Sequence, residues 1–118
     1  MSKKSKPPRA ETPYLGEFEQ LVLLAILRLG DEAYGMKIRQ EIKAAGRTAS
    51  LGAVYTTLER LEQKASVSSW VGDPTPQRGG RAKKIFKVQG SGLVALRQSV
   101  KITTSLCGGL GQLLGGAA

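Results

Sequence analysis

Three apolar patterns of helical period are followed by two short strand-like runs and a fourth helical pattern, and this order restricts the possible folds. The strand-like runs span residues 67–71 and 84–88, and a loop rich in proline, glycine and arginine joins them. A lone two-stranded hairpin is only marginally stable in water, so it must pack against the helices. The sequence therefore predicts a mainly α fold with a small β-hairpin (α+β).

The first two helical patterns, at about 16–29 and 34–45, differ in how much of their surface is apolar. Residues 16–29 are apolar nearly all round, which predicts a helix at the centre of the fold. Its side chains available for burial are Phe18, Leu21, Val22, Leu23, Leu24, Ala25, Ile26 and Leu27. The second helix has a single apolar stripe and a suitable stop at Gly46. That stripe consists of Tyr34, Ile38, Ile42 and Ala45.

A third helix is predicted at about 51–64, with Ser50 as its N-cap. At about 100° per residue, its core stripe consists of Leu51, Val54, Leu58 and Leu61, with Tyr55 at the edge. The opposite face consists of Gly52, Ala53, Thr56, Arg60 and Gln63. Three helices, a hairpin and a last helix from about residue 91 form a winged helix-turn-helix with a C-terminal extension.

Charge is segregated along the chain, which has a net charge of +9. Residues 1–10 carry +4 and residues 78–118 carry +7, both without any acid, whereas residues 11–77 sum to −2. Clustered cations release the counterions of a nucleic-acid backbone together, so the pattern favours a phosphate-rich partner. A basic tail with a solvated charged loop is the alternative.

Several classes of chemistry are excluded by what the sequence lacks. Without histidine and with Cys107 as its one cysteine, it has no imidazole base and no multi-cysteine metal site. We expect no enzyme, no cofactor and no bound metal. The aliphatic run at 21–27 is too short to span a bilayer, and no signal-peptide pattern is present. We expect a cytoplasmic protein without a membrane partner.

The exposed face of the third helix suits the major groove of DNA. Gly52 and Ala53 would let the backbone approach the bases, and Thr56 and Arg60 could contact base edges. The alternative is that this is only the solvent face of an amphipathic helix. The loop at 72–81 has two prolines on one side and Gly79-Gly80 at its tip, an arrangement that would present Arg78 and Arg81 to a groove or to phosphates.

The last helix carries an apolar seam at alternating spacings of three and four residues, which suits packing against a second copy. Its members are Leu93, Leu96, Val100, Thr103, Cys107, Leu110 and Leu114. Glycines at 108, 109 and 111 predict a frayed or bent end, and packing onto the chain's own domain is the alternative. We therefore predict a flexible basic arm (1–13), a DNA-binding domain (14–89) and a C-terminal dimerisation helix (90–118).

Several motifs together resemble the PadR-like family of bacterial transcriptional regulators. They are Tyr34-Gly35, the run at 51–62, the loop at 72–81 and the strand at 83–88, within a match over about residues 15–100. The resemblance implies a homodimeric repressor that binds an inverted-repeat operator, with the third helix in the major groove. It also implies that Tyr55 lies near the DNA backbone and that the wing adds contacts.

Two positions depart from the family pattern. Family members usually have glycine after the third helix, where this chain has Ala65; if a positive φ is needed there, alanine costs about 1 kcal/mol. After the second strand, residues 89–92 read Gln-Gly-Ser-Gly, which weakens the start of the last helix.

We predict a sequence-specific, DNA-binding transcriptional regulator, a homodimeric repressor whose partners are double-stranded DNA and a second copy. The alternative is a winged-helix module that binds protein or RNA. The third helix lacks an exposed apolar patch, and most of the six aromatic residues fall on core-like stripes, which disfavours stacking on RNA. Whether the regulator also binds a small-molecule effector is left open by the sequence. Predicted DNA-binding residues are Ser50, Gly52, Ala53, Tyr55, Thr56, Arg60, Arg78, Arg81, Lys83 and Lys84; dimerisation residues are Leu93, Leu96, Val100, Cys107 and Leu110.

Overall fold

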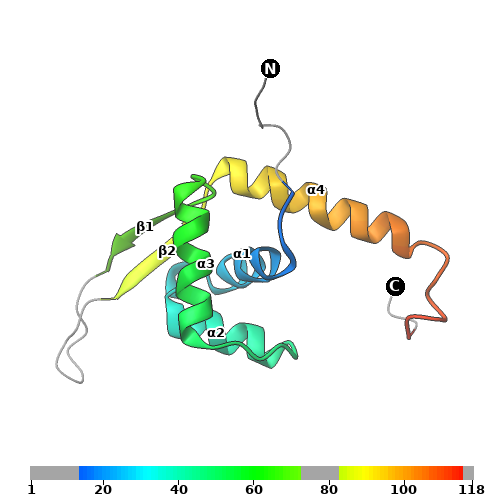
Figure 1. Cartoon of the computed structure of the whole chain (residues 1–118), viewed down its shortest axis with the longest axis horizontal. Helices are drawn as coiled ribbons and strands as arrows, with labels where there is room; N and C mark the ends of the chain where they lie inside the picture. Colours follow the sequence, from blue (N-terminus) through cyan, green and yellow to red (C-terminus); the bar gives the residue numbers. More distant parts are fainter. Residues whose placement is uncertain (1–13, 73–82, 116–118) are drawn as a thin grey trace, which may run out of the picture.

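The computed structural model describes residues 14–72 and 83–115, and the predicted order of elements is confirmed (Figure 1). The fold is mainly α with one two-stranded antiparallel sheet, a winged helix-turn-helix. The elements are α1 (Glu17–Leu29), the 3₁₀ turn η2 (Gly30–Glu32), α2 (Gly35–Ala44), α3 (Leu51–Gln63), β1 (Val67–Val71), β2 (Lys84–Val88) and α4 (Gly90–Cys107). Among the helices of these described residues, none has the length and apolarity required to cross a membrane.

Helix α1 lies at the centre, in contact with α2, α3, α4 and β2, as its nearly all-round apolar surface predicts. Val22 and Leu23 are fully buried there, and side chains from all four partners complete the core. Leu27, which the sequence makes available for burial, is 48% exposed near the C-terminal end of the helix. The helix ends at Gly30, whose φ of 59° suits a residue without a Cβ.

The connection from α2 to α3 turns at Gly46, which has a φ of 112° and confirms the predicted stop. Arg39 on α2 donates from Nε to the carbonyl oxygen of Ala49 at 2.8 Å and so holds the turn in place. Ala45, expected on the buried stripe of α2, is exposed because α2 ends at Ala44 and the chain turns away.

The hairpin is anchored to the helices at Ile85 and Phe86. Ile85 pairs with Trp70 of β1 on one side and forms an isolated bridge with Tyr34 on the other. The N–H of Phe86 donates to the carbonyl of Ala33 at 2.9 Å, and its ring is buried in the core. The sheet therefore cannot rotate freely relative to η2 and α2.

Two backbone features set the path from α3 to the hairpin and α4. Ala65 has a φ of 62°, so the position does require the left-handed conformation that a family glycine would adopt readily. Gly92 lies against the backbone of Ser66, and a Cβ there would overlap the Ser66 carbonyl. Gly92, in the first turn of α4, therefore allows close packing on Ser66 as well as weakening the start of the helix.

Helix α4 ends at Cys107, with Gly108 as its C-cap, and turns follow to residue 115. Leu110 and Leu114, which the seam placed on one continuous helix, lie beyond its end. In Figure 1 most of α4 projects away from the three-helix core, and α3 and the hairpin lie at the other side of the molecule.

Candidate nucleic-acid interface

Helix α3 presents one polar face to solvent and buries the other. Ser50 caps the helix by accepting a hydrogen bond from the Ala53 N–H at 3.0 Å, as predicted. The predicted base-facing residues Gly52, Ala53, Thr56 and Arg60 are all exposed on the outer side, whereas Val54, Leu58 and Leu61 are buried. Thr57 is also buried, which the predicted stripe did not include.

Tyr55 lies at the edge of α3 and leans onto the start of α2. A Cβ at Gly35 would overlap the phenol ring, so the ring rests directly on the Gly35 backbone. The first N–H groups of a helix have no partner within it and give this end a partial positive charge. The phenol of Tyr55, which is 44% exposed, thus lies beside a helix end that favours anions such as phosphate.

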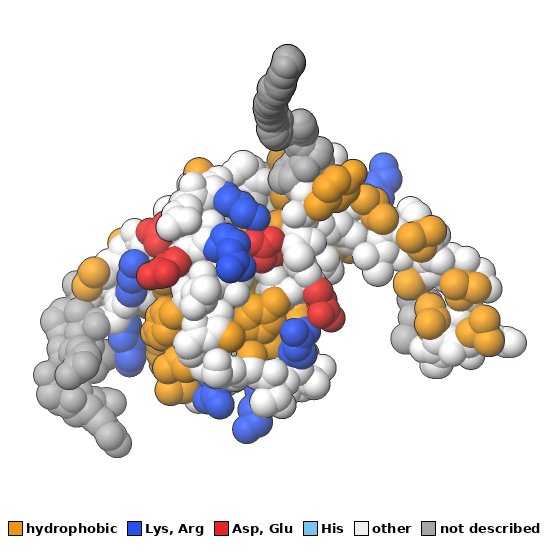
Figure 2. Space-filling view, in the orientation of Figure 1, with side chains coloured by type: hydrophobic (Ala, Val, Ile, Leu, Met, Phe, Trp, Pro, Cys, Tyr) orange, Lys and Arg blue, Asp and Glu red, His pale blue; other side chains and the backbone are white. Residues whose placement is uncertain are grey.

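Glu62 joins α3 to the hairpin. Its carboxylate accepts a hydrogen bond from Ser69 Oγ at 2.7 Å and lies 3.7 Å from Lys84 Nζ. These contacts fix the position of the hairpin, and of Lys84, relative to α3. Figure 2 shows Lys, Arg and acidic side chains gathered over α3 and beside the hairpin. Sequence reasoning missed Glu62, because acids on a helix near basic residues are common and do not indicate which strand they meet.

Lys84, the first residue of β2, and Lys83, just before it, point in different directions. Lys84 Nζ lies 5.6 Å from the ring centre of Phe86, on the side of Glu62. Lys83 Nζ instead lies 4.6 Å from the ring centre of Tyr34. Both lysines are exposed, but only Lys84 is tied to α3. Arg78 and Arg81 lie outside the described residues.

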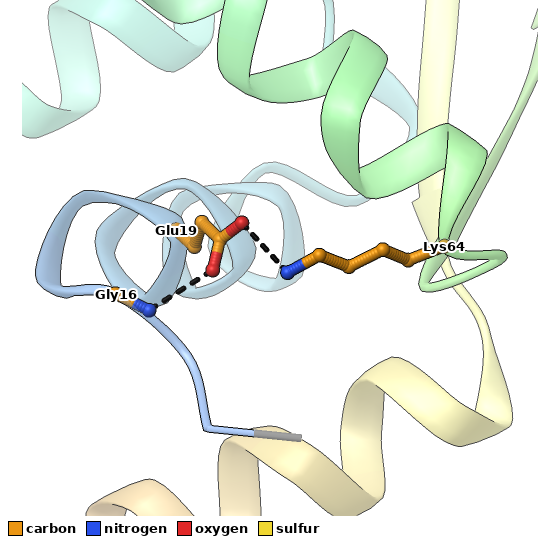
Figure 3. A network of polar contacts seen from close by, with 3 residues as sticks. All are labelled: Gly16, Glu19 and Lys64. Atoms are coloured by element: carbon orange, nitrogen blue, oxygen red, sulfur yellow. Dashed lines mark hydrogen bonds and ion pairs between the residues drawn. The ribbon is translucent and has the colours of Figure 1, made fainter. Parts of the chain in front are cut away.

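A buried acid joins the start of α1 to the end of α3 (Figure 3). Glu19 accepts hydrogen bonds from the Gly16 N–H through Oε1 and from Lys64 Nζ through Oε2, each at 2.9 Å. Burial by itself raises the pKa of Glu19, but the hydrogen bonds and the nearby charges of Lys64 and Arg60 outweigh it. The pKa is therefore lowered below its ordinary value of 4.5. No sequence pattern pointed to this pair.

Three of the predicted dimerisation residues, Leu93, Leu96 and Val100, line one groove, whereas Cys107 and Leu110 lie farther along the chain. Leu96 is only 3% exposed and belongs to the chain's own core, so little of its side chain is left to contact a second copy. Leu93 and Val100 line an open groove of about 420 Å³ between α4 and Leu24 of α1. Cys107 and Leu110 are exposed farther along, and Figure 2 shows hydrophobic side chains on the projecting part of α4.

The aromatic residues are less buried than the sequence indicated. Tyr14, Tyr55 and Trp70 are exposed, and only Phe86 is fully in the core. Trp70 lies on β1, the outer strand of the sheet, and Tyr55 lies at the edge of α3 against Gly35. The exposed rings of Tyr55 and Trp70 are available for stacking, so the aromatic residues do not disfavour RNA.

A three-helix core with an exposed polar α3 and a hairpin tied beside it defines a winged-helix DNA-binding protein. The model of the transcriptional regulator PadR-like family matches residues 23–98, and the chain belongs to this family. It is therefore a DNA-binding transcriptional regulator, a class that is generally not enzymatic.

Solved structures of PadR-family regulators share the fold. One from Eggerthella lenta is 26% identical with a TM-score of 0.61, and the alignment covers 84% of this chain and 87% of the Eggerthella lenta chain. One from Bacillus cereus is 20% identical with a TM-score of 0.67, covering 84% and 92%. One from Clostridium difficile is 21% identical with a TM-score of 0.66, covering 83% and 99%. Comparison with curated proteins gives no match.

Proposed function

We propose that this regulator is a homodimeric repressor that binds an inverted-repeat operator with α3 in the major groove. The observation that carries the proposal is the exposed face of α3. Small Gly52 and Ala53 lie near its start, and Thr56 and Arg60 follow on the same side. A helix with this order can bring its backbone close to the bases and still reach them with hydrogen-bonding side chains. Such a protein acts where its DNA is, in the cytoplasm.

Base recognition is tested by replacing Arg60. Arg60→Ala should weaken binding to the selected operator by about 1–3 kcal/mol and binding to random DNA far less. Arg28→Ala, which removes an exposed arginine from α1, away from α3 and from the groove beside α4, is the matched control and should change neither. Equal losses on both DNAs for Arg60→Ala would mean that this arginine contacts only the backbone.

The wing and the N-terminal arm are proposed to contact phosphates. Lys84→Ala should weaken binding to all sequences and reduce the slope of log K against log salt by about one unit. Residues 1–10 carry a charge of +4. Deletion of the arm, residues 1–13, should therefore lower non-specific DNA binding at low salt and leave Tm nearly unchanged. An unchanged salt slope for Lys84→Ala would remove the wing from the interface.

Dimerisation is proposed to use the groove beside α4. Leu24, Leu93 and Val100 leave apolar surface there, and an inverted repeat requires a two-fold symmetric protein. Val100→Asp should give a folded monomer in sedimentation, because it would bury like charges near the axis. Val94→Asp changes an exposed valine on another side of the same helix and should stay dimeric. A dimeric Val100→Asp protein would place the interface elsewhere.

RNA recognition is the second candidate, favoured by the exposed rings of Tyr55 and Trp70. Competition of labelled duplex DNA with single-stranded RNA of the same sequence separates the two functions. The proposed function requires that duplex DNA binds more tightly at physiological salt.

A further inference from the structure

A pocket of about 520 Å³ lies at the base of the hairpin, on the side where Tyr34 bridges to β2. Its size falls within the range of small-molecule sites in proteins. It is lined by Asp31, Glu32, Tyr34, Trp70, Gly72, Lys83 and Ile85. Base recognition by α3 and packing of α4 do not use this pocket, and Lys83 is its one lining residue among the predicted DNA contacts.

Strand pairing places two aromatic rings on either side of Ile85. Trp70 is opposite Ile85 in the sheet, and Tyr34 is opposite it in the isolated bridge. Residues directly opposite each other in antiparallel pairs point to the same face. Because neighbouring strands lie about 4.8 Å apart, the backbones of Tyr34 and Trp70 are about 10 Å apart, with Ile85 as an apolar floor between them.

Glycine keeps the pocket open beside the rings. The Gly72 N–H donates to the Lys83 carbonyl at 2.7 Å, which extends the pairing by one step. Gly72 therefore occupies a position where another residue would direct a side chain towards Ile85, whose Cγ1 lies 3.4 Å from an ideal Cβ built there.

A cation already occupies one aromatic face of the pocket. Lys83 comes just before β2 and two residues before Ile85, and its Nζ is 4.6 Å from the ring centre of Tyr34. Two acids, Asp31 and Glu32, stand at the rim. Lys37 is 3.5 Å from Glu32, so Lys37 and Lys83 together balance the two acids, and one negative charge is left without a partner when the Lys83 ammonium moves away.

We propose that this pocket binds a small organic cation with an apolar body, of the trimethylammonium type, which displaces the Lys83 ammonium from Tyr34. Methyl groups around a positive charge suit the faces of Tyr34 and Trp70 and the Ile85 floor, and the charge suits the two acids. A Lys ammonium is small and flexible and contacts one ring only, whereas this ligand fills the space between both. The proposal does not depend on how α3 recognises DNA.

The test uses choline as the probe and 3,3-dimethylbutan-1-ol as its neutral match in shape. Trp70 is the chain's one tryptophan, so the full ¹⁵N-labelled protein has a single indole N–H signal, which reports from inside the pocket. Choline should shift this signal along a saturable curve. The neutral alcohol should bind at least about threefold more weakly, because cation–π attraction is then absent.

Two variants and a control complete the test. Tyr34→Leu should weaken choline binding about threefold to thirtyfold, the range for one cation–π contact. Lys83→Ala removes the competing ammonium and should tighten choline binding. Tyr14→Leu removes an exposed ring outside the pocket and should change nothing. Equal binding of choline and the alcohol, no saturable shift, or no effect of Tyr34→Leu in a protein with a native-like spectrum would each overturn the proposal.

Discussion

The phenol of Tyr55 on α3 rests against the backbone of Gly35, the first residue of α2, in space that a Cβ would fill. The two residues come from the two helices of the helix-turn-helix. Because the ring has no room to lie there beside any other residue, Gly35 determines where the phenol points. Gly35 is therefore a positioning residue for a predicted DNA contact.

A double-mutant cycle tests this contact. Gly35→Ala should lower the free energy of unfolding of the otherwise wild-type protein, because the Tyr55 ring must move. The coupling energy between the two positions should be about 1–2 kcal/mol. In a Tyr55→Ala background the same change should be neutral or stabilising, because alanine favours a helix over glycine by up to about 1 kcal/mol. Urea unfolding of the four proteins measures the coupling. The same sign in both backgrounds would contradict the role given to Gly35.

Ala65 is strained at the end of α3. Its φ of 62° costs an alanine more than a glycine, so Ala65→Gly should raise the free energy of unfolding by about 1 kcal/mol and Tm by several degrees. Ala45→Gly is the matched control, because Ala45 also follows a helix but has a φ of −81°. The free energy of unfolding of Ala45→Gly should fall by about 0.5–1 kcal/mol. Calorimetry of both proteins checks the opposite signs.

Gly92 and Gly90 both lie in the first turn of α4 but differ in their surroundings. Gly92→Ala should destabilise the fold by about 1–3 kcal/mol, because the added methyl group overlaps the Ser66 backbone, which cannot swing away as a side chain would. Gly90→Ala meets no atom within 4 Å and should be neutral or stabilising. If thermal melts show equal effects, α4 does not pack closely on Ser66.

The pair formed by Glu19 and Lys64 makes stability depend on pH. The pKa of Glu19 is lowered in the folded chain, so its contribution is complete above the ordinary value of 4.5 and is lost as pH falls through the lowered pKa. Glu19→Gln should be less stable than the parent by about 1.5–3 kcal/mol at pH 7, the range for hydrogen bonds to a charged group. The gap between the two proteins should narrow below pH 4.5.

Glu17→Gln is the control for that experiment. Glu17 pairs with Arg47 at 2.9 Å, but its side chain is 77% exposed, and exposed pairs contribute little. Urea unfolding at several pH values should therefore show a much smaller change. A gap for Glu19→Gln that stays constant down to pH 3 would show that the carboxylate charge is not what stabilises the pair.

Local sequence patterns predicted most of the helices and strands. The apolar surface of 16–29 predicted a central α1, the Ser50 cap and the stripe through Val54, Leu58 and Leu61 predicted α3, and the two short runs have the strand bounds observed. Each of these depends on residues a few positions apart, whose spacing decides which side of a helix or strand is apolar. The outward face of α3 follows from the same spacing.

Partners far apart in sequence could be decided only by the tertiary structure. The spacing of Leu96 suits packing against a second chain as well as packing in the core of its own chain. Only the position of α4 against α1 shows that Leu96 is buried in the core. Glu19 is separated from Lys64 by 45 residues, and Tyr34 meets Trp70 only through Ile85 between them. The sequence by itself determined which residues prefer helix, strand, core or solvent, because these preferences are local. The meeting of distant side chains depends on how the elements pack, and no local spacing encodes that arrangement.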